Sequence, residues 1–303
     1  MRGQQPQNID RLFGLAGTVE QAGLDSVWVG DSLMAKPRME PLSILSALAA
    51  RTTRVRLGTA VLLPALRHPV LLAQSLATVD LISGGRLVIG AGVGGAFNSD
   101  QKREWVAAGV SAEGRAHRFE EIIKIVQGLG SGRSFDFHGR NFDLDAGLMR
   151  PVPINPAGIP FLLGTHYRAH SKAQIRRAAQ LGAGIISISD SPDEFAQVIQ
   201  QVSEKAIEIG RDPKSLENTF YMTVNMNSNL AAAEADALEW LTGYYGSDIW
   251  GTRWGPFGCA ERVRDRIVQY EDAGAETVII RFASFEPERQ LEIFLEKVAS
   301  FFT

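Results

Sequence analysis

The chain has 303 residues, and its 31 Lys and Arg against 34 Asp and Glu give a formal net charge of −3. This balance favours neither nucleic acid nor an anionic membrane as a partner. A single cysteine, Cys259, excludes an internal disulfide. No apolar run reaches the ~18 residues of a membrane span, and the first ten residues contain no apolar signal segment. These features predict a cytoplasmic protein.

The clearest structural pattern lies in residues 55–93. Residues 55–63 and 86–93 are two apolar runs rich in Val, Ile and Leu, and residues 68–82 between them have helical spacing. Buried runs of this kind are typical of strands covered on both faces. A helix between two such strands predicts a parallel βαβ unit.

The same alternation continues along the chain. Further strands are expected at 26–30, 160–165, 184–189, 218–226 and 277–282. Helices are expected at 9–22, 41–53, 115–129, 171–181, 192–209, 230–245, 260–273 and 287–302. Residues 134–144 predict an inserted hairpin and residues 95–114 a polar loop. Seven strands, each followed by a helix, predict an α/β fold, a (β/α)8 TIM barrel that forms a single domain over residues 1–303 and lacks its first strand.

Four stretches resemble the luciferase-like family of flavin- and deazaflavin-dependent oxidoreductases. They are GLDSVWVGDSL (23–33), PLSILSALAARTTRVRLGTAVLLP (41–64), RHPVLLAQSLATVDLISGGRLVIGAGVG (67–94) and AQIRRAAQLGAG (173–184). The resemblance implies a TIM barrel that uses reduced FMN, with O₂ if it is a monooxygenase, on a small-molecule substrate. Coenzyme F420 in a hydride-transfer enzyme is the alternative cofactor. A non-catalytic barrel that acts as a binding protein is the alternative of another class.

The resemblance also bears on the N-terminus and on assembly. Family members begin with a strand ending in Leu-Pro, and residues 1–8 are too short and too polar to supply it. A true start upstream of Met1 is expected, and a barrel that lacks the strand is the alternative. Family members commonly dimerise, so a homodimer is expected, with the apolar helices 41–53 and 68–82 contributing to it.

The active site of a TIM barrel forms at the C-terminal ends of its strands. Asp31 follows the strand 26–30, and the resemblance implies a catalytic or cofactor-binding role for it; a helix cap or loop carboxylate is the structural alternative. Ser32 is the second catalytic candidate, because deazaflavin-dependent family members usually have a histidine at this position after the aspartate. A serine does not donate a proton near neutral pH without help, which counts against coenzyme F420.

Two further strand ends carry expected cofactor contacts. The resemblance places a bulge at Thr59, with a non-prolyl cis peptide between Ala60 and Val61 behind the isoalloxazine ring. Gly92 and Gly94 lie in a glycine-rich stretch that does not meet the conditions of a dinucleotide-binding fingerprint. They are expected to let the backbone approach a flat cofactor closely. Asn98 is expected to contact the flavin or the substrate.

The strand 160–165 ends in a loop that the resemblance assigns to the cofactor phosphate. Gly164, Thr165 and His166 would hold the phosphate through their amides, and Arg168 and His170 make the loop more basic. The other strand ends supply expected pocket residues, namely Ser187, Ser189, Asp190, Thr223, Asn225 and Arg281. An aromatic loop is expected either to cover the substrate or to pack in the core, and it contains Tyr244, Tyr245, Trp250 and Trp254.

The remaining candidates have simpler structural interpretations. His68 is expected to cap or pack at the start of a helix, and Arg86 to stabilise a turn. His117 and His138 are also interpreted as structural. No cluster of His, Cys, Asp and Glu has the spacing of metal ligands, so no metal site is expected.

Overall fold

The computed structural model describes residues 9–246 and 251–302. The chain forms two compact units. The N-terminal unit comprises Asn8–Gly164 and Gln180–Gly184, and the C-terminal unit comprises Thr165–Ala179 and Ile185–Thr303. A single domain over residues 1–303 stays a prediction. Residues 1–8, in which the first strand was sought, lie outside the described residues.

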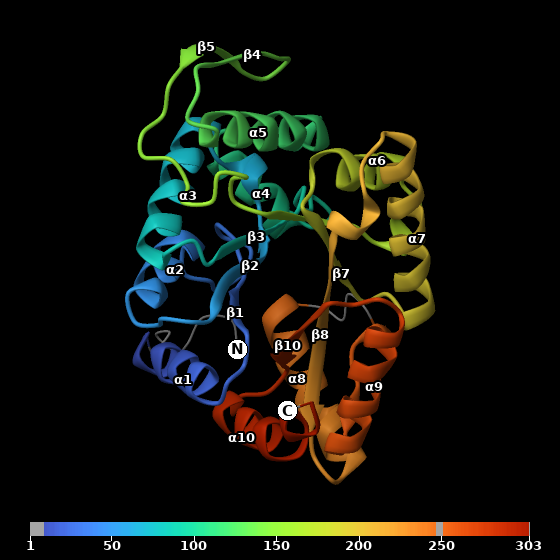
Figure 1. Ribbon diagram of the computed structural model, residues 1–303. Coiled ribbons are helices and arrows are strands. Elements are labelled where there is room, and N and C mark those ends of the chain that lie inside the picture. Colours follow the sequence, from blue (N-terminus) through green and yellow to red (C-terminus); the bar gives the residue numbers. More distant parts are fainter. Residues whose placement is uncertain (1–8, 247–250, 303) are drawn as a thin grey trace. The chain divides into compact units, whose positions relative to one another are not determined.

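Four parallel strands form the sheet of the N-terminal unit (Figure 1). In spatial order they are β1 (Ser26–Val29), β2 (Arg56–Leu62), β3 (Leu87–Ala91) and β6 (Phe161–Gly164). Leu57 of β2 pairs with Val27 on one side and Leu87 on the other. All four predicted strands of this unit are therefore confirmed. Because the strands are parallel, their C-terminal ends lie at the same edge of the sheet.

The helices of the N-terminal unit are α1 (Ile9–Gln21), α2 (Pro41–Ala49), α3 (Pro69–Ser83), α4 (Ser99–Ala107) and α5 (Arg115–Gly130), with a 3₁₀ turn η1 (Pro64–Leu66). Helix α3 contacts both α2 and α5 (Figure 1). Fully buried side chains from these helices and from the strands form one core, including Leu45, Leu57, Leu76, Ile89, Phe119 and Ile122.

Helix α4 corrects the sequence prediction, which assigned residues 95–114 to a loop. The side chain of Asn98 caps the helix by accepting a hydrogen bond from the Gln101 amide at 2.9 Å. Trp105 is buried, and its indole nitrogen donates to the Gly95 carbonyl at 2.8 Å. Only two residues of this helix, Glu104 and Trp105, are buried, so its composition is mostly polar. It therefore lacks the apolar spacing from which a helix is predicted.

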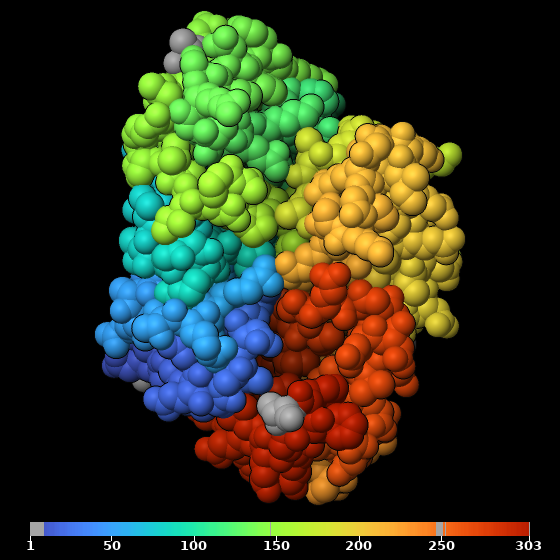
Figure 2. Space-filling view, in the orientation of Figure 1, coloured from blue at the N-terminus to red at the C-terminus, as the bar shows by residue number. Residues whose placement is uncertain are grey.

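The inserted hairpin is confirmed as β4 (Phe135–His138) paired antiparallel with β5 (Asp143–Gly147). Figure 2 shows this green segment on the surface. Its turn is tied to α5, because the buried carboxylate of Glu121 accepts hydrogen bonds from the amides of Arg140 and Asn141 at 2.8 and 2.9 Å. A charged side chain thus fixes a surface hairpin to the core of its unit.

Arg86 confirms its predicted structural role and explains the end of α2. Its guanidinium donates to the carbonyl of Ala49, the last residue of α2, at 3.0 Å and to the carbonyl of Thr52 just after the helix at 2.8 Å. It also donates to Ser83 O, Val55 O and Thr52 Oγ1, at 2.6, 2.9 and 2.9 Å. A cation at a helix C-terminus satisfies orphan carbonyls, so α2 ends at Ala49 rather than at residue 53 as predicted.

In the C-terminal unit the strands lie in the order β7 (Gly184–Ile188), β8 (Glu217–Met226) and β10 (Thr277–Phe282). The first residue of β7, Gly184, is counted with the N-terminal unit. The two-residue strand β9 (Phe257–Gly258) pairs with β8. Their helices are α6 (Lys172–Leu181), α7 (Pro192–Glu208), α8 (Leu230–Tyr245), α9 (Ala260–Asp272) and α10 (Pro287–Lys297). Short 3₁₀ turns are η2 (Tyr167–Ala169), η3 (Pro213–Ser215), η4 (Gly251–Arg253) and η5 (Ala299–Phe301). The predicted strands are confirmed, and the last helix ends earlier than expected.

Packing in the C-terminal unit centres on three aromatic rings. Phe220 of β8 stacks on Tyr270 of α9 with ring centroids 3.7 Å apart, and Phe195 of α7 meets both rings edge-on. Residues alternate along β8, so Phe220 points to this helix-covered face while Tyr221 and Thr223 belong to the opposite face. That opposite face carries the polar strand ends described below.

No helix within the described residues is both long enough and apolar enough to cross a membrane.

Candidate active site

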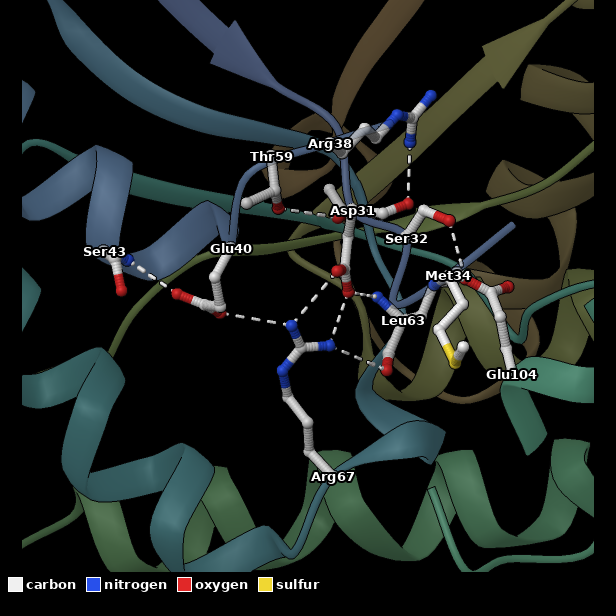
Figure 3. Close-up of polar contacts among 11 residues, drawn as sticks. Asp31, Ser32, Met34, Arg38, Glu40, Ser43, Thr59, Leu63, Arg67 and Glu104 are labelled. Carbon is white, nitrogen blue, oxygen red and sulfur yellow. Dashed lines mark hydrogen bonds and ion pairs between the residues drawn. The ribbon is translucent and has the colours of Figure 1, made fainter. Parts of the chain in front are cut away.

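Asp31 lies just beyond β1, and its carboxylate is held by an arginine that follows the 3₁₀ turn η1. The carboxylate is buried and forms a bidentate pair with Arg67, at 2.5 Å from Nη1 to Oδ2 and 3.1 Å from Nη2 to Oδ1 (Figure 3). The Leu63 amide also donates to Oδ2 at 2.9 Å. Both carboxylate oxygens are therefore occupied by fixed donors.

The pair extends to the start of α2. Arg67 Nη2 donates to Glu40 at 3.2 Å, and Glu40 caps α2 by accepting from the Ser43 amide at 2.7 Å (Figure 3). Arg38 donates to the Asp31 carbonyl at 2.7 Å. Burial opposes the charge of Arg67, but the bonds to Asp31 and Glu40 raise its pKa above the ordinary value. This arrangement holds the loop between β1 and α2, which favours a positioning role for Asp31.

Ser32 also has a fixed partner. Its hydroxyl donates to Glu104 Oε1 of α4 at 2.6 Å and accepts from the Lys36 amide at 2.9 Å. The same carboxylate oxygen accepts from the amides of Met34 and Ala35 at 2.9 and 3.0 Å. Burial raises the pKa of Glu104, but these hydrogen bonds outweigh it and the pKa lies below its ordinary value. Ser32 and Glu104 form a closed network around the loop 32–36.

The end of β2 has the geometry that the family resemblance implies. The peptide between Ala60 and Val61 is cis, and the pairing of β2 with β3 shifts register between Thr59 and Leu62. Both expectations are confirmed. Thr59 is fully buried, and its hydroxyl donates to the Gly90 carbonyl at 2.8 Å, so it joins the two strands. A direct contact of Thr59 with a cofactor stays a prediction.

The glycines after β3 have a packing role that the sequence analysis did not foresee. A Cβ on Gly92 would lie 2.8 Å from Val61 Cγ2, and one on Gly94 would lie 3.0 Å from the Trp105 ring. Gly94 also has a φ of +86°, which few other residues adopt. Asn98 is exposed and serves as the α4 cap. Cofactor contacts of Gly92, Gly94 and Asn98 stay predictions.

In the loop after β6, two of the three amides expected to bind a phosphate already have hydrogen-bond partners. A Cβ on Gly164 would lie 3.3 Å from the Ala91 carbonyl, so this glycine permits a close approach of backbone segments. In the C-terminal unit, the Thr165 amide donates to the Ile186 carbonyl at 3.1 Å and the His166 amide to Gln174 at 3.2 Å. Both amides are thus already used, and Arg168 and His170 are exposed. Phosphate binding by Gly164, Thr165 and His166 stays a prediction.

His166 instead belongs to a hydrogen-bonded series within the C-terminal unit, near the end of β7. Its Nδ1 lies 3.3 Å from the Ser187 hydroxyl, which donates to Asp190 Oδ2 at 2.6 Å. Because the one hydroxyl proton of Ser187 goes to Asp190, Nδ1 carries a proton in this arrangement and Nε2 has a free lone pair. Burial lowers the pKa of His166 despite the opposing charge of Asp190, so the ring is neutral at pH 7.

Asp190 and Asn225 fix the neighbouring strand ends. Asp190 also accepts from the Tyr167 amide at 3.0 Å, and its carbonyl accepts from the Tyr270 hydroxyl at 2.7 Å. Asn225 donates to Asp236 Oδ2 at 2.6 Å and to the Ala283 carbonyl at 2.8 Å. These bonds join β7 to α9, and β8 to α8 and to the end of β10.

Arg281 of β10 contacts residues of the predicted aromatic loop. Its guanidinium donates to Thr223 Oγ1 from Nε at 3.1 Å and from Nη2 at 2.7 Å, and to the Tyr245 hydroxyl at 2.5 Å. The guanidinium carbon also lies 4.8 Å from the ring centroid of Trp254. Tyr244 packs against Tyr245. Trp250 lies outside the described residues.

The other candidates have structural surroundings. His68 is exposed and meets Phe142 edge-on, while His117 and His138 pair with Glu121 and Asp143. The Ser189 carbonyl accepts from Arg253 at 3.0 Å. Within residues 9–246 and 251–302, no group of three or more His, Cys, Asp or Glu side chains is placed to hold a metal ion.

Sequence reasoning missed several residues that the structure brings together within each unit. They are Glu40, Arg67 and Glu104 in the N-terminal unit, and Tyr221 and Trp240 in the C-terminal unit. Glu104 is 72 positions from Ser32 and lies in a helix that was taken for a loop, so no local pattern pointed to it. Arg281 carried a usable signal, because it is the one charged residue of the apolar strand TVIIRF.

Comparison with known proteins identifies relatives of the whole chain. The sequence model of a family described as luciferase-like monooxygenase matches residues 1–254. An F420-dependent glucose-6-phosphate dehydrogenase of Amycolatopsis mediterranei is 28% identical over 95% of this chain and 92% of its own length.

Solved structures share the fold. The monooxygenase RslO1 of Streptomyces bottropensis superposes with a TM-score of 0.83 at 23% identity, covering 98% of this chain and 94% of that one. The oxygenating constituent of 3,6-diketocamphane monooxygenase of Pseudomonas putida, in complex with FMN, gives 0.76 at 17% identity, with coverage of 99% and 96%. The chain therefore has the fold of the luciferase-like TIM barrels, as predicted.

Proposed function

The chain belongs to the luciferase-like monooxygenase family, whose members are oxidoreductases, and within that family we propose that it uses reduced FMN, with O₂, on a small organic substrate. Other members of this group of relatives use coenzyme F420, which makes hydride transfer with that deazaflavin the alternative. The flavin supplies the redox chemistry when it is bound. The protein supplies its binding, its orientation and the protection of the reacting atoms from water.

One observation carries the proposal of a flat tricyclic cofactor. Residues 92–96, Gly-Val-Gly-Gly-Ala, follow β3 and are all half-buried, and no side chain among them is longer than valine. They lie at the strand-end edge that also holds Val61, which is likewise half-buried. A flat ring system can approach the backbone of such a segment closely because the segment's own side chains are short. We assign the isoalloxazine ring to this surface of the N-terminal unit.

The network of Ser32 supports FMN over coenzyme F420. Oxidation of an alcohol by hydride transfer needs a base that takes the hydroxyl proton. Beyond β1, Asp31 is paired with Arg67, and Ser32 donates to a glutamate whose pKa is lowered. In this arrangement the side chains of Asp31, Ser32 and Glu104 position the loop. Oxygen-dependent flavin chemistry depends less on an acid or base supplied by the protein, because the flavin itself carries the redox reaction.

His166 is the observation that favours the alternative. Its ring is neutral at pH 7, and the lone pair on Nε2 is the one a general base uses. The Ser187 hydroxyl and Asp190 hold the ring in that tautomer. In an F420-dependent enzyme, His166 would take the proton that leaves with the hydride. Substitution of His166 would then abolish turnover without weakening cofactor binding.

Titration of the purified chain with FMN and with coenzyme F420, followed by quenching of cofactor fluorescence, tests the proposal. We expect saturable binding of FMN. Ala96→Trp places an indole on the surface 92–96 and should weaken FMN binding at least tenfold. Val106→Trp is the matched control, because Val106 is 79% exposed on α4. Binding of F420 alone would overturn the proposal in favour of the alternative, and binding of neither cofactor would refute both.

A further inference from the structure

Arg281 is a cation enclosed by aromatic rings in the C-terminal unit. The guanidinium carbon lies 5.1 Å from the ring centroid of Tyr221, 5.6 Å from Trp240, 5.4 Å from Tyr245 and 4.8 Å from Trp254. Trp254 is buried, and the other three rings are half-buried, as is Arg281 itself. The group therefore lies between the core of the unit and its surface.

The hydrogen bonds of Arg281 leave part of the guanidinium unused. A guanidinium has five N–H groups. One on Nε and one on Nη2 donate to Thr223 Oγ1, and one on Nη1 donates to the Tyr245 hydroxyl. Among the residues that the structure describes, one N–H therefore remains without a partner on each terminal nitrogen. Two N–H groups on Nη1 and Nη2 are what a carboxylate uses in a bidentate pair.

The charge of Arg281 has no ionic partner in the part of the chain that the structure describes. Its acceptors there are two neutral hydroxyls. Other arginines of the same unit do have carboxylate partners: Arg253 pairs with Glu194, and Arg264 with Asp265 at 3.0 Å. Burial opposes the charge of Arg281, but the neighbouring tyrosines raise its pKa above the ordinary value, so it stays cationic. A partly desolvated cation of this kind is strongly stabilised by an anion.

We propose that Arg281 binds a carboxylate of the substrate, and that the rings of Tyr221, Trp240, Tyr245 and Trp254 contact the apolar or aromatic body that carries it. The proposal rests on the oxidoreductase function above and specifies its substrate as an apolar or aromatic carboxylic acid. The same N–H groups would also accept a phosphate of the cofactor. The rings favour the substrate, because a hydrated phosphate tail gains nothing from four aromatic neighbours, whereas an apolar acid buries surface against them.

Benzoate, with neutral benzamide as its isostere, is a direct probe of this proposal. Binding to the full chain is measured by isothermal titration calorimetry without cofactor. We expect benzoate to bind at least tenfold more tightly than benzamide. Arg281→Met should weaken benzoate binding at least tenfold, and Arg281→Lys should weaken it less, since a lysine keeps the charge and loses the planar fork. Arg264→Met is the matched control: Arg264 also lies over an aromatic ring, Phe301, but has its own carboxylate partner.

Thermal unfolding separates a binding role from a purely structural one. If the role of Arg281 is to bind a ligand, the Tm of Arg281→Met measured without ligand should equal or exceed that of the wild type. Benzoate should then raise the Tm of the wild type and not that of the variant. A fall in the Tm of Arg281→Met, with benzoate binding equal in both proteins, would show that the arginine only fastens β10 to α8 and would overturn the proposal. If Arg281→Met does not fold, Arg281→Lys and Thr223→Val give the same comparison.

The cofactor titrations identify the source of the anion. Loss of FMN or F420 binding in Arg281→Met, with benzoate binding unchanged, would assign Arg281 to the cofactor phosphate and overturn the proposal. Failure of both cofactors to bind the wild type, with benzoate binding that depends on Arg281, would refute the redox function and leave the carboxylate site standing. No benzoate binding to the wild type, with FMN bound, would refute the carboxylate site alone.

Discussion

Buried carboxylates near the strand ends each accept more than one hydrogen bond. Asp31 accepts from Arg67 and an amide, Glu104 from a hydroxyl and two amides, and Asp190 from a hydroxyl and an amide. Hydrogen bonds to an ionised acceptor are roughly twice as strong as neutral ones. The loops at the candidate site are therefore held by charged anchors, which is how a site is kept in one geometry before its ligand arrives.

Glu104→Gln tests the anchor of the loop 32–36. The amide oxygen keeps one acceptor but loses the charge, and the amide NH₂ meets groups that themselves donate. We expect the free energy of unfolding to fall by about 1–3 kcal/mol in urea titrations at pH 7. Glu113→Gln is the control, because Glu113 is exposed, and it should change stability by less than about 0.5 kcal/mol.

The effect of Glu104→Gln on stability should depend on pH. The pKa of Glu104 is lower in the folded chain than its ordinary value of 4.5. Its contribution to stability is therefore complete above pH 4.5 and is lost as the pH falls through the folded pKa. The difference between the wild type and Glu104→Gln should shrink below pH 4.5. A difference that stays constant down to pH 3 would contradict a charge-based anchor.

His166 gives a pH dependence at higher pH. Its pKa in the folded chain is lowered, so below the ordinary value of 6.5 the unfolded chain binds a proton that the folded chain does not. The free energy of unfolding should decrease as the pH falls from 7.5 to 5.5, and His166→Gln should remove part of this slope. Urea titrations at the two pH values measure it.

His138 provides a control of opposite sign. The hydrogen bond that His138 donates to the Asp143 carboxylate raises the pKa of this exposed histidine, so its contribution to stability is complete below pH 6.5 and is lost as the pH rises through the folded pKa. His138→Gln should therefore not reduce the loss of stability on acidification. Equal effects of the two substitutions would show that the half-buried His166 ring is not kept neutral by the fold.

At the scale of elements, the strands and most helices were predictable from sequence because burial sets their composition. Strands covered on both faces are continuous apolar runs, and helices packed on a sheet show period-3.6 spacing. Helix α4 was not predicted because it buries so few of its residues that it lacks this spacing. The capping pair of Asn98 and Gln101 was the available signal, and it was passed over in a polar context.

The candidate site was predictable only in part. The cis peptide at Ala60–Val61 and the positions at strand ends followed from the resemblance and from the barrel rule. Partners that are distant in the sequence could not be predicted, because Arg67 is 36 positions from Asp31 and Glu104 is 72 positions from Ser32. The packing reasons for Gly92 and Gly94 also needed their neighbours in space, because sequence shows that a glycine is present without showing which atom excludes a side chain.

Pairing of β1 with β2 depends on one glycine. Trp28 pairs with Gly58, and a Cβ on Gly58 would lie 2.1 Å from Trp28 Cε3. Gly58→Ala must displace the indole, so we expect a loss of about 1–3 kcal/mol in the free energy of unfolding. Gly17→Ala on α1 meets nothing within 4 Å and should stabilise the helix by about 0.5–1 kcal/mol. A neutral Gly58→Ala would mean that Trp28 has room to move.

At the scale of the whole molecule, the homodimer stays a prediction with a defined surface to test. A groove of about 480 Å³ on the N-terminal unit is lined by residues of α2 and α3, including Ser43, Leu71 and Gln74. Leu71 is 64% exposed there. Light scattering after size exclusion should give a dimer for the wild type and a monomer for Leu71→Glu. Ile207→Glu, equally exposed on α7, should stay dimeric, and a monomeric wild type would refute the expectation.

The five hydrogen bonds of Arg86 also govern how the N-terminal unit opens. One side chain at the start of β3 holds the carbonyls that end α2 and lead into β2, so α2 cannot fray without releasing bonds on β3. We expect amide hydrogens of α2 and β3 to exchange with solvent at similar rates, as parts of one cooperative unit. In Arg86→Lys, with three donors, amides of α2 should exchange faster than those of β3. A single guanidinium thereby decides whether these elements open together or separately.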